Sequence, residues 1–300
     1  CQLAAASSFG TAADFGPYDD WGNASRFGYV RTVESPSKVI ASLQDLNGDG
    51  LADRLMSNDS LSTGFWKCQL NNGAGLDTAA TVSGLEDMDP NDPNLRNLSH
   101  SYRDASLDTF TKAELVDMTG DGLPDRVVKL ASGDSFYKVQ ANSGSGFSTS
   151  FNFGGIDNLG NASKYGWIRT VQDPYKAVAT LQDINGDGLP DRVLADDSLT
   201  VWKVQFNKGS SFDTAEDWGP IERPGTDNNL RNIIYSVRPS GSSTSYTKAD
   251  FFDVNGDGLP DRILKDTDTA TVFKVQINNG HGFESMEDWT GIDTNGNAAV

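Results

Sequence analysis

The chain has 300 residues and a formal net charge of −18, because 42 Asp and Glu outnumber 24 Lys and Arg. This acidity argues against nucleic acid and anionic membranes as partners, and no apolar run is long enough to insert through a bilayer. A hydrophobic content of 37% with 31 glycines is typical of a turn-rich β protein with ample material for a core. With only two cysteines, Cys1 and Cys68, a disulfide-stapled scaffold is excluded.

The first and last stretches of the chain copy parts of its interior. Cys1-Gln-Leu3 aligns with Cys68-Gln-Leu70, and Phe15-Gly-Pro17 aligns with Trp218-Gly-Pro220. The stretch 291–298 aligns with 155–162. We therefore expect residues 1–16 to end a preceding repeat and residues 291–300 to start a following one. The chain would then be a window from a longer tandem array, or its ends would complete a neighbour's unit.

Two long repeats fill the rest of the chain, at residues 17–154 and 155–290. Trp21–Val33 returns as Leu159–Val171, and the first and third of four Asp-rich loops start 138 residues apart. Each long repeat contains two shorter units of roughly 70 residues, with one such loop in each. Repetition at such periods is typical of solenoids, propellers and tandem arrays.

Each short unit is predicted to be a series of short strands around its loop. One apolar strand enters the loop, a second leaves it, and a third shows the alternation of a half-buried strand. An Asn/Gly turn and an apolar residue then lead into a fourth strand. The entering strands are expected at Val39–Leu43, Ala113–Val116, Val178–Leu181 and Ala249–Phe252. The third strands are expected at Trp66–Leu70, Tyr137–Ala141, Trp202–Phe206 and Phe273–Ile277.

The polar connectors Asp87–Ser106 and Pro220–Ser245 are expected to be surface loops. The tryptophans at repeated positions are expected in the core rather than as sugar-stacking platforms. The two histidines, His100 and His281, fall at non-equivalent positions with no Ser or Cys pattern beside them. A histidine-based catalytic or metal site is therefore not expected, and we predict both to be exposed in loops.

The four loops repeat one nine-residue pattern, with side-chain oxygens at positions 1, 3, 5 and 9 and glycine at positions 4 and 6. Calcium takes about six to eight oxygen ligands, and such alternation can wrap a backbone around one ion. The glycines allow the positive φ that a tight wrap needs. We expect about four Ca²⁺ per chain, with the backbone carbonyl of position 7 completing each ligand shell. The expected ligands are Asp45, Asn47, Asp49, Leu51 and Asp53; Asp117, Thr119, Asp121, Leu123 and Asp125; Asp183, Asn185, Asp187, Leu189 and Asp191; and Asp253, Asn255, Asp257, Leu259 and Asp261.

Two other interpretations fit the loop sequences less well. A plain turn needs only one or two of these residues, so four copies of the full pattern disfavour it. An EF-hand needs a bidentate Glu at position 12 on an exiting helix, whereas position 12 is Met56, Val128, Leu194 or Leu264 in a short apolar run. The loops are thus predicted to exit into strands, with the side chain of the position-7 leucine in the core. Thr119 replaces Asn at position 3, so the second loop is expected to bind more weakly.

Four Asn-x-Ser sequons occur, at Asn23, Asn58, Asn97 and Asn161. Asn23 and Asn161 occupy the same repeat position in a polar segment. All four are candidate glycosylation sites if the source glycosylates secreted proteins.

The loop, the strands around it and the nearby Phe15-Gly-Pro17 and Trp218-Gly-Pro220 elements resemble the FG-GAP, or VCBS-type, repeats. Such repeats occur in integrin alpha-chain propellers, toxin-complex B components and microbial surface proteins. The resemblance covers all four units and is looser for the long connectors. It implies four-stranded β-propeller blades with one calcium ion in the hairpin loop of each.

The expected fold is therefore all-β, with four tandem propeller-like blades in two long repeats. Four blades are few for a closed ring, so an open or stacked linear array is the alternative. The expected function is that of a non-enzymatic, extracellular or cell-surface calcium-binding protein with a structural or adhesive role, as a segment of a filament. Self-association into a fibre and a protein or glycan ligand are the expected partnerships. The alternative is a propeller scaffold module of a larger toxin or carbohydrate-active enzyme.

Overall fold

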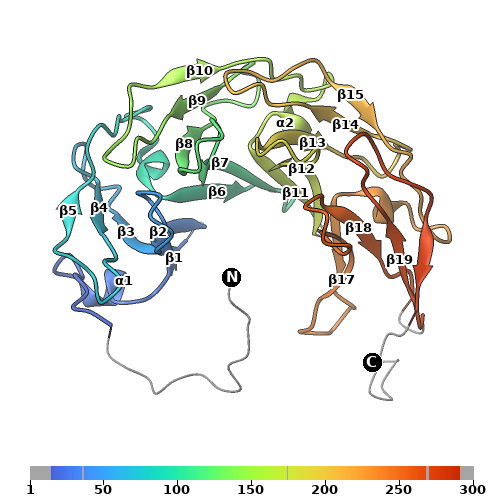
Figure 1. Cartoon of the computed structure of the whole chain (residues 1–300), viewed down its shortest axis with the longest axis horizontal. Coiled ribbons are helices and arrows are strands. Elements are labelled where there is room, and N and C mark those ends of the chain that lie inside the picture. The colour runs from blue at the N-terminus through green and yellow to red at the C-terminus, as the bar shows by residue number, and fades with distance from the viewer. Residues whose placement is uncertain (1–14, 36, 174, 268–269, 291–300) are drawn as a thin grey trace.

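The computed structural model describes residues 15–35, 37–173, 175–267 and 270–290. In these residues the protein is all-β, with 20 strands, two four-residue α-helices and two 3₁₀ turns (Figure 1). Every pairing between named strands is antiparallel. The expected fold class is confirmed.

The strands form four consecutive units of five. Unit 1 consists of α1 (Ala24–Phe27), β1 (Thr32–Glu34), β2 (Lys38–Gln44), β3 (Asp53–Ser57), β4 (Trp66–Gln69) and β5 (Ala80–Thr81). Unit 2 consists of η1 (Pro93–Arg96), β6 (Ser99–Arg103), β7 (Thr109–Val116), β8 (Asp125–Val128), β9 (Tyr137–Gln140) and β10 (Phe151–Phe153). Unit 3 consists of α2 (Ala162–Tyr165), β11 (Arg169–Gln172), β12 (Lys176–Gln182), β13 (Asp191–Leu194), β14 (Trp202–Gln205) and β15 (Glu216–Trp218). Unit 4 consists of η2 (Asn228–Arg231), β16 (Ile234–Val237), β17 (Tyr246–Phe252), β18 (Asp261–Leu264), β19 (Phe273–Gln276) and β20 (Glu287–Trp289).

The first strand of each unit was not expected. In units 2, 3 and 4 this strand pairs both with the second strand of the preceding unit and with that of its own unit, and so joins adjacent units. In β6, His100 pairs both with Lys38 of β2 in unit 1 and with Ala113 of β7 in unit 2. The strands β11 and β16 bridge units 2 to 3 and 3 to 4 in the same way. The polar sequence Ser-His-Ser-Tyr-Arg of β6 has no apolar alternation to predict a strand, but its backbone pairs with a neighbouring strand on each edge.

The prediction that the long connectors are surface loops is also wrong, because each contains a strand that joins two units. The connector 87–106 contains η1 and β6, and its residues Leu95, Leu98 and His100 are buried. The connector 220–245 contains η2 and β16, with Leu230 and Ile233 buried. His100 is thus a buried strand residue, and burial lowers the pKa of its imidazole. His281 is exposed as expected.

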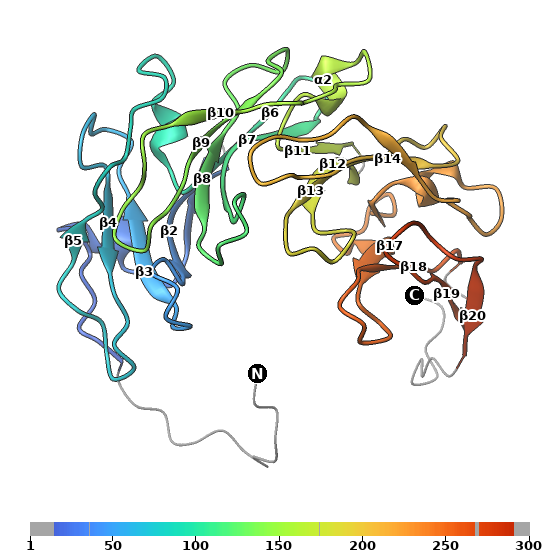
Figure 2. The ribbon, with the colours of Figure 1, turned by 45° about the horizontal axis from the view of Figure 1, so that its top comes forward.

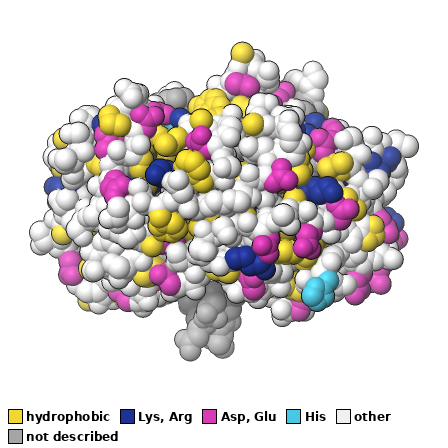
Figure 3. Space-filling model, turned by 90° about the horizontal axis from the view of Figure 1, so that it is seen from above, with side chains coloured by type: hydrophobic (Ala, Val, Ile, Leu, Met, Phe, Trp, Pro, Cys, Tyr) yellow, Lys and Arg dark blue, Asp and Glu magenta, His cyan; other side chains and the backbone are white. Residues whose placement is uncertain are grey.

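The four units follow one another along an open arch (Figures 1 and 2). Unit 1 and unit 4 lie at the two ends of the arch, and among the described residues no strand of one pairs with a strand of the other. The units therefore form the open arrangement that was expected as the alternative, and not a closed four-unit ring. On the outer face seen from above, hydrophobic, acidic and basic side chains are interspersed (Figure 3). Residues 1–14 and 291–300, where the partial repeats were expected, lie outside the described residues.

The hydrophobic core of each unit is completed by its successor. Trp66, Leu55 and neighbouring residues of unit 1 form one cluster with apolar residues of unit 2. Three residues of each later unit take part, and we call them its closing residues. One lies just before the first strand, one lies in the second strand and one follows the Asn/Gly turn. They are Leu98, Leu115 and Phe147 for unit 2; Ile168, Leu181 and Phe212 for unit 3; and Ile233, Phe251 and Phe283 for unit 4.

We predict that truncating one closing residue destabilises the preceding unit. Phe212 is buried and packs edge-to-face on Tyr137 and Phe153 of unit 2. Phe212→Ala should cost about 3–5 kcal/mol, since it removes a buried ring and leaves a cavity. Thermal unfolding should show a melting temperature several degrees lower.

The neighbouring variant Asp213→Ala is the control. Asp213 is exposed, and its partner Lys208 is too. An exposed pair of this kind contributes at most about 1 kcal/mol, so this variant should melt close to the wild type. Equal melting temperatures for the two variants would contradict the role given to Phe212.

Candidate metal site in the four hairpin loops

Each Asp-rich loop connects the second and third strands of its unit as a hairpin. The loop of unit 3 runs from Asp183 to Asp191, and Asp191 begins β13 opposite Gln182 of β12. The other loops are placed in the same way. The predicted strand exit is confirmed, and the helix exit of an EF-hand is absent from all four loops.

The first aspartate of each loop accepts hydrogen bonds from both loop glycines. Asp183 Oδ1 accepts from the N–H of Gly186 at 2.7 Å, and Oδ2 accepts from the N–H of Gly188 at 2.9 Å. The two glycines have φ of 79° and 85°, a region that side chains with a Cβ rarely adopt. The same bonds recur in the other three loops. The backbone therefore folds around the carboxylate of position 1.

Positions 3 and 5 add further oxygens to this wrap. Asn185 Oδ1 accepts from the N–H of Asp187 at 3.0 Å, and Asp187 Oδ1 accepts from the N–H of Leu189 at 2.9 Å. The Asn185 amide also donates to Asp187 Oδ2 at 3.1 Å. The side chains of positions 1, 3 and 5 thus stay with their own loop rather than reaching into neighbouring segments.

The aspartate of position 9 is buried at the base of the loop. Asp191 is 0% exposed, accepts from the N–H of Ile184 through Oδ2 and accepts from the N–H of Asn207 through Oδ1. Burial raises the pKa of Asp191 to about 6. The two N–H donors oppose this rise in pKa, and the nearby Asp183 and Asp187 carboxylates add to it. Three acidic groups of one loop therefore lie within electrostatic reach of one another.

The negative charge of these loops is not paired with cationic side chains where the structure describes the chain. In the described residues, none of the twelve loop aspartates forms an ion pair with Lys, Arg or His. Other aspartates do find such partners, as Asp59 does with Lys38 at 2.6 Å. Each loop therefore concentrates negative charge that only a cation from solution would balance.

The donor chemistry of the loops fits a hard cation. No three His, Cys, Asp or Glu side chains of the described residues are grouped so as to hold a metal by themselves. The loop donors, however, include an amide oxygen and a backbone carbonyl as well as carboxylates. A carboxylate oxygen can accept two hydrogen bonds, so those that accept one N–H keep a lone pair for a ligand. In unit 3, the residues that would hold calcium are Asp183, Asn185, Asp187, Leu189 through its carbonyl, and Asp191.

The second loop differs at position 3, as its sequence suggested. The Thr119 hydroxyl donates to Asp125 Oδ2 at 3.1 Å, and the Thr119 N–H donates to the same oxygen at 3.0 Å. Met118 N–H is a third donor to that oxygen. The Thr119 side chain is therefore engaged with the position-9 carboxylate, in a loop that was expected to bind calcium more weakly.

The leucine of position 7 does not point into the core of its own unit, which corrects the expectation. A Cβ added to Gly48 would lie 2.8 Å from Leu123 Cδ2, so the leucine of the second loop covers the glycine of the first. Leu189 covers Gly120 and Leu259 covers Gly186 in the same way. The loops of adjacent units are therefore in contact and form a row.

The first asparagine of the Asn/Gly turn in units 2, 3 and 4 also contacts this row of loops. Asn142 donates its backbone N–H to Asp125 Oδ1 and its side-chain amide to the carbonyl of Leu46 in the preceding loop, each at 2.7–2.8 Å. Asn207 and Asn278 make the equivalent bonds to units 2 and 3. Their shared position after each third strand was visible in the sequence, but their contact with a loop some 90 residues earlier was not.

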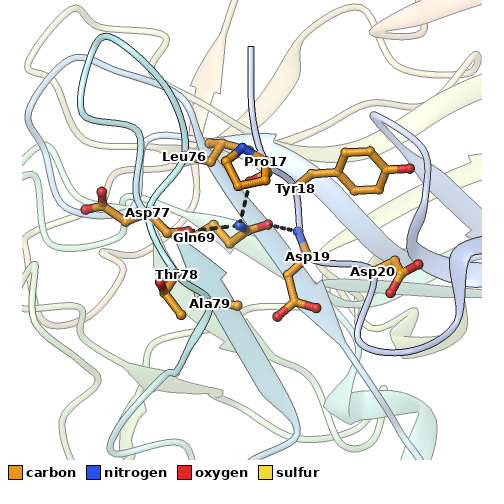
Figure 4. A pocket seen from close by; sticks show the side chains of 9 residues that line it. All are labelled: Pro17, Tyr18, Asp19, Asp20, Gln69, Leu76, Asp77, Thr78 and Ala79. Carbon is orange, nitrogen blue, oxygen red and sulfur yellow. Dashed lines mark hydrogen bonds between the residues drawn. The ribbon is translucent and has the colours of Figure 1, made fainter. Parts of the chain in front are cut away.

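A buried Arg–Gln pair holds each hairpin to its connector. Arg126, which follows the position-9 aspartate, donates to Gln140 Oε1 and to the carbonyls of Glu86 and Leu95. Figure 4 shows the equivalent glutamine of unit 1 beside a hollow of about 730 Å³. There Gln69 Nε2 donates to the carbonyls of Pro17 and Asp77. Because this clamp recurs in every unit, we interpret the polar side chain beside the hollow as structural.

The four sequons are not equivalent in the structure. Asn97 is 1% exposed and its amide donates to Asp59 and Asn94, which leaves no room for a glycan. Asn58 is half-buried against Arg26. Asn23 and Asn161 are exposed and cap α1 and α2 through their side-chain oxygens. Only this last pair lies fully on the surface, as their shared position suggested.

Comparison with known proteins gives distant structural likenesses only. No family model matches the chain, and no curated protein does. A solved structure of an Agrocybe aegerita lectin, described as recognising non-reducing terminal N-acetylglucosamine, is 20% identical with a TM-score of 0.49. The match covers 83% of this chain and 52% of the lectin. The Photorhabdus luminescens Tc holotoxin pore is 16% identical with a TM-score of 0.41, over 88% of this chain and 12% of the toxin chain.

Both likenesses are too distant to say what this chain binds or does. The chain spans about half of the lectin and a small part of the toxin chain. Among the described residues, no helix is both long enough and apolar enough to cross a membrane.

We predict that Asp183→Asn removes one calcium ion per chain. Asparagine keeps one oxygen, which can accept from only one of the two glycine N–H groups, and it loses the charge that attracts a dication. Metal analysis after dialysis against calcium should fall from about four ions per chain to about three. Asp213→Asn, on an exposed turn outside the loops, should leave the stoichiometry unchanged.

Within one loop, Asp187→Ala should weaken calcium binding more than Asn185→Ala, because it removes a charged donor rather than a neutral one. Isothermal titration of the two variants would compare them. A wild-type protein that takes up no calcium would rule out the metal site altogether.

Proposed function

We propose that the chain is an extracellular, non-enzymatic, calcium-binding repeat protein with a structural or adhesive role, as a segment of a cell-surface or extracellular filament. The observation that carries this proposal is the row of four hairpin loops. Each has three aspartates in an oxygen-rich wrap, and none of these has a cationic partner among the described residues. On the same ground we propose that the four units are calcium-binding repeats of the FG-GAP or VCBS kind.

In this proposal calcium supplies the charge that the loops lack. Each dication adds two positive charges, so four would bring the formal net charge from −18 to about −10. The residues of the chain do the positioning. Asp183 and Asp187 hold the loop backbone in its wrap, and the buried Asp191 ties the loop to the turn at Asn207. Since an ion would bind the folded loop only, its binding free energy adds to the free energy of folding.

The contacts between loops extend this stabilisation along the arch. Leu189 rests on Gly120 of the preceding loop, and Asn207 donates to the carbonyl of Met118 there. A loop that is ordered by its ion thus presents a fixed surface to the next loop. We expect the row of loops to stabilise the four units relative to one another, which suits a structural or spacing role.

An extracellular setting agrees with this chemistry. Millimolar calcium outside cells keeps even modest sites filled. The described thiol, Cys68, is buried, and burial raises its pKa to about 12, so it stays unreactive in an oxidising environment. We further propose that the exposed Asn23 and Asn161 carry glycans where the source glycosylates secreted proteins.

We predict that removing calcium destabilises the protein. Without a cation the three aspartates of each loop repel one another, and the wrap held by Asp183 should loosen. Addition of EGTA should lower the melting temperature by several degrees or more, since about 1 kcal/mol shifts a domain of this size by about 2–4 °C. Readdition of calcium should restore it.

Magnesium at the same concentration is the matched control. It demands a smaller octahedral site and should restore less stability than calcium. A melting temperature that EGTA leaves unchanged would show that calcium does not hold the fold.

A further inference from the structure

Two kinds of contact cross each junction between neighbouring loops, which we number 1 to 4 by their units. One is the leucine of position 7, which covers the position-4 glycine of the preceding loop. The other is the asparagine after the third strand, whose amide donates to the position-2 carbonyl of that loop at 2.7, 3.0 and 2.7 Å. Both recur at all three junctions, so they belong to the design of the unit rather than to one place in the arch.

The asparagine contacts connect the four position-9 aspartates into one series of hydrogen bonds. Asp125 accepts from the backbone N–H of Asn142 through Oδ1 and from that of Met118 through Oδ2, at 2.8 and 2.9 Å. The amide of Asn142 donates to loop 1, and the carbonyl of Met118 accepts from unit 3. The same links repeat at the next junction. The series therefore runs without a break from Asp53 in loop 1 to Asp261 in loop 4.

Every residue in this series is buried, and none is more than 7% exposed. A buried polar group that loses its partner is costly, so the neighbours of each link oppose its displacement. Each asparagine is itself oriented, because its side-chain oxygen accepts the N–H of the glycine two residues later. A buried network in which the hydrogen bonds are made is rigid. The position of one aspartate thus constrains the position of the next.

The leucine of position 7 takes part in two loops at once. The N–H of Leu189 donates to Asp187 Oδ1, and its carbonyl is an expected calcium ligand of loop 3. Its side chain packs on Gly120 of loop 2, where an added Cβ would lie 2.5 Å from Leu189 Cδ2. The N–H of Gly120 donates in turn to Oδ1 of Asp117, the first expected ligand of loop 2, at 2.7 Å. One residue therefore contacts the backbone of two neighbouring sites.

We propose that the four loops bind calcium with positive cooperativity, because a filled loop fixes the leucine and asparagine contacts that it shares with its neighbours. The inference rests on the calcium binding proposed above and adds its regulation. An empty loop must lose conformational freedom to form its site. A neighbour that already holds the shared contacts in place lowers this entropic cost, and a lower cost at the second site is positive coupling.

Repulsion between the ions of adjacent loops opposes this coupling. Positions 4 to 6 of every loop are exposed, so salt screens the repulsion, over about 8 Å at physiological ionic strength and about 3 Å at 1 M. The buried hydrogen bonds between loops are screened much less. The coupling is therefore measured most clearly at high salt.

Loop 2 is the most sensitive place to detect coupling. It is expected to bind calcium more weakly than the others, because Thr119 replaces Asn and its hydroxyl donates to Asp125. It also lies between loops 1 and 3 in the row. Coupled loops fill together, whereas independent loops would leave loop 2 to fill last.

The test follows each loop separately during a calcium titration in about 1 M salt. The amide NMR signals of Gly48, Gly120, Gly186 and Gly256 report on loops 1 to 4, because each N–H donates to the first aspartate of its own loop. We expect the four signals to change over one calcium range, with a Hill coefficient of about 2 or more. Four signals that change independently, each with a Hill coefficient of about 1, overturn the proposal.

Two variants cut the row between loops 2 and 3. Leu189→Ala keeps the carbonyl ligand but removes the side chain from Gly120, and Asn207→Ala removes the amide that reaches Met118. In each variant the signals of loops 1 and 2 should separate from those of loops 3 and 4, and loop 2 should need about fivefold more calcium or more. Lys208→Ala, at an exposed residue of the same turn, is the matched control and should titrate like the wild type.

Leu189 is only half-buried, so its variant should fold even where the loss of the buried Asn207 amide does not allow folding; circular dichroism checks both. Loops that still fill together in every folded variant overturn the proposal. Calcium bound at four independent loops overturns the coupling and leaves the calcium role intact. A wild-type protein that binds no calcium overturns both.

Discussion

The structure depends on one buried carboxylate in each unit, the aspartate at position 9 of the loop. Asp191 has no exposed surface and no cationic partner in the part of the chain that the structure describes, and backbone N–H groups from two separate segments hold it. One donor belongs to its own loop and the other is Asn207, at the turn after the third strand. A buried carboxylate is costly unless it is hydrogen-bonded, so these segments must stay together for the unit to fold.

The same carboxylate links each unit to the one before it. Asn207 donates its backbone N–H to Asp191, and its side-chain amide reaches the carbonyl of Met118 in the preceding loop. The closing residue Phe212 follows five residues later and completes the preceding core. The turn that begins at Asn207 thus places both a polar and an apolar contact against the preceding unit. Such a chain of units is stabilised mainly by contacts between nearest neighbours.

Adjacent units depend on each other for a complete hydrophobic core. Each unit buries its closing residues in its predecessor and leaves its own core to its successor. Among the described residues, Val30 and Leu43 of unit 1 and Phe273 and Trp289 of unit 4 are exposed.

The sequence by itself determined the local chemistry of each unit. The nine-residue loop pattern predicted a hairpin between strands with glycines at positive φ, and the alternation in Trp202–Gln205 predicted a half-buried third strand. These features depend on residues close together in the chain, so periodicity and turn chemistry suffice to identify them. The calcium itself remains a prediction of that local pattern.

Only the tertiary structure decided how the units are joined. It made a strand of the polar segment Ser99–Arg103, buried His100 within it, and turned Leu123 onto Gly48 instead of into its own core. It also opened the four units into an arch. These outcomes follow from contacts between residues some 60 to 90 positions apart, such as Asn142 with Leu46. Local propensity carries no information about such partners, because the pairing free energy arises only when the neighbouring unit is in place.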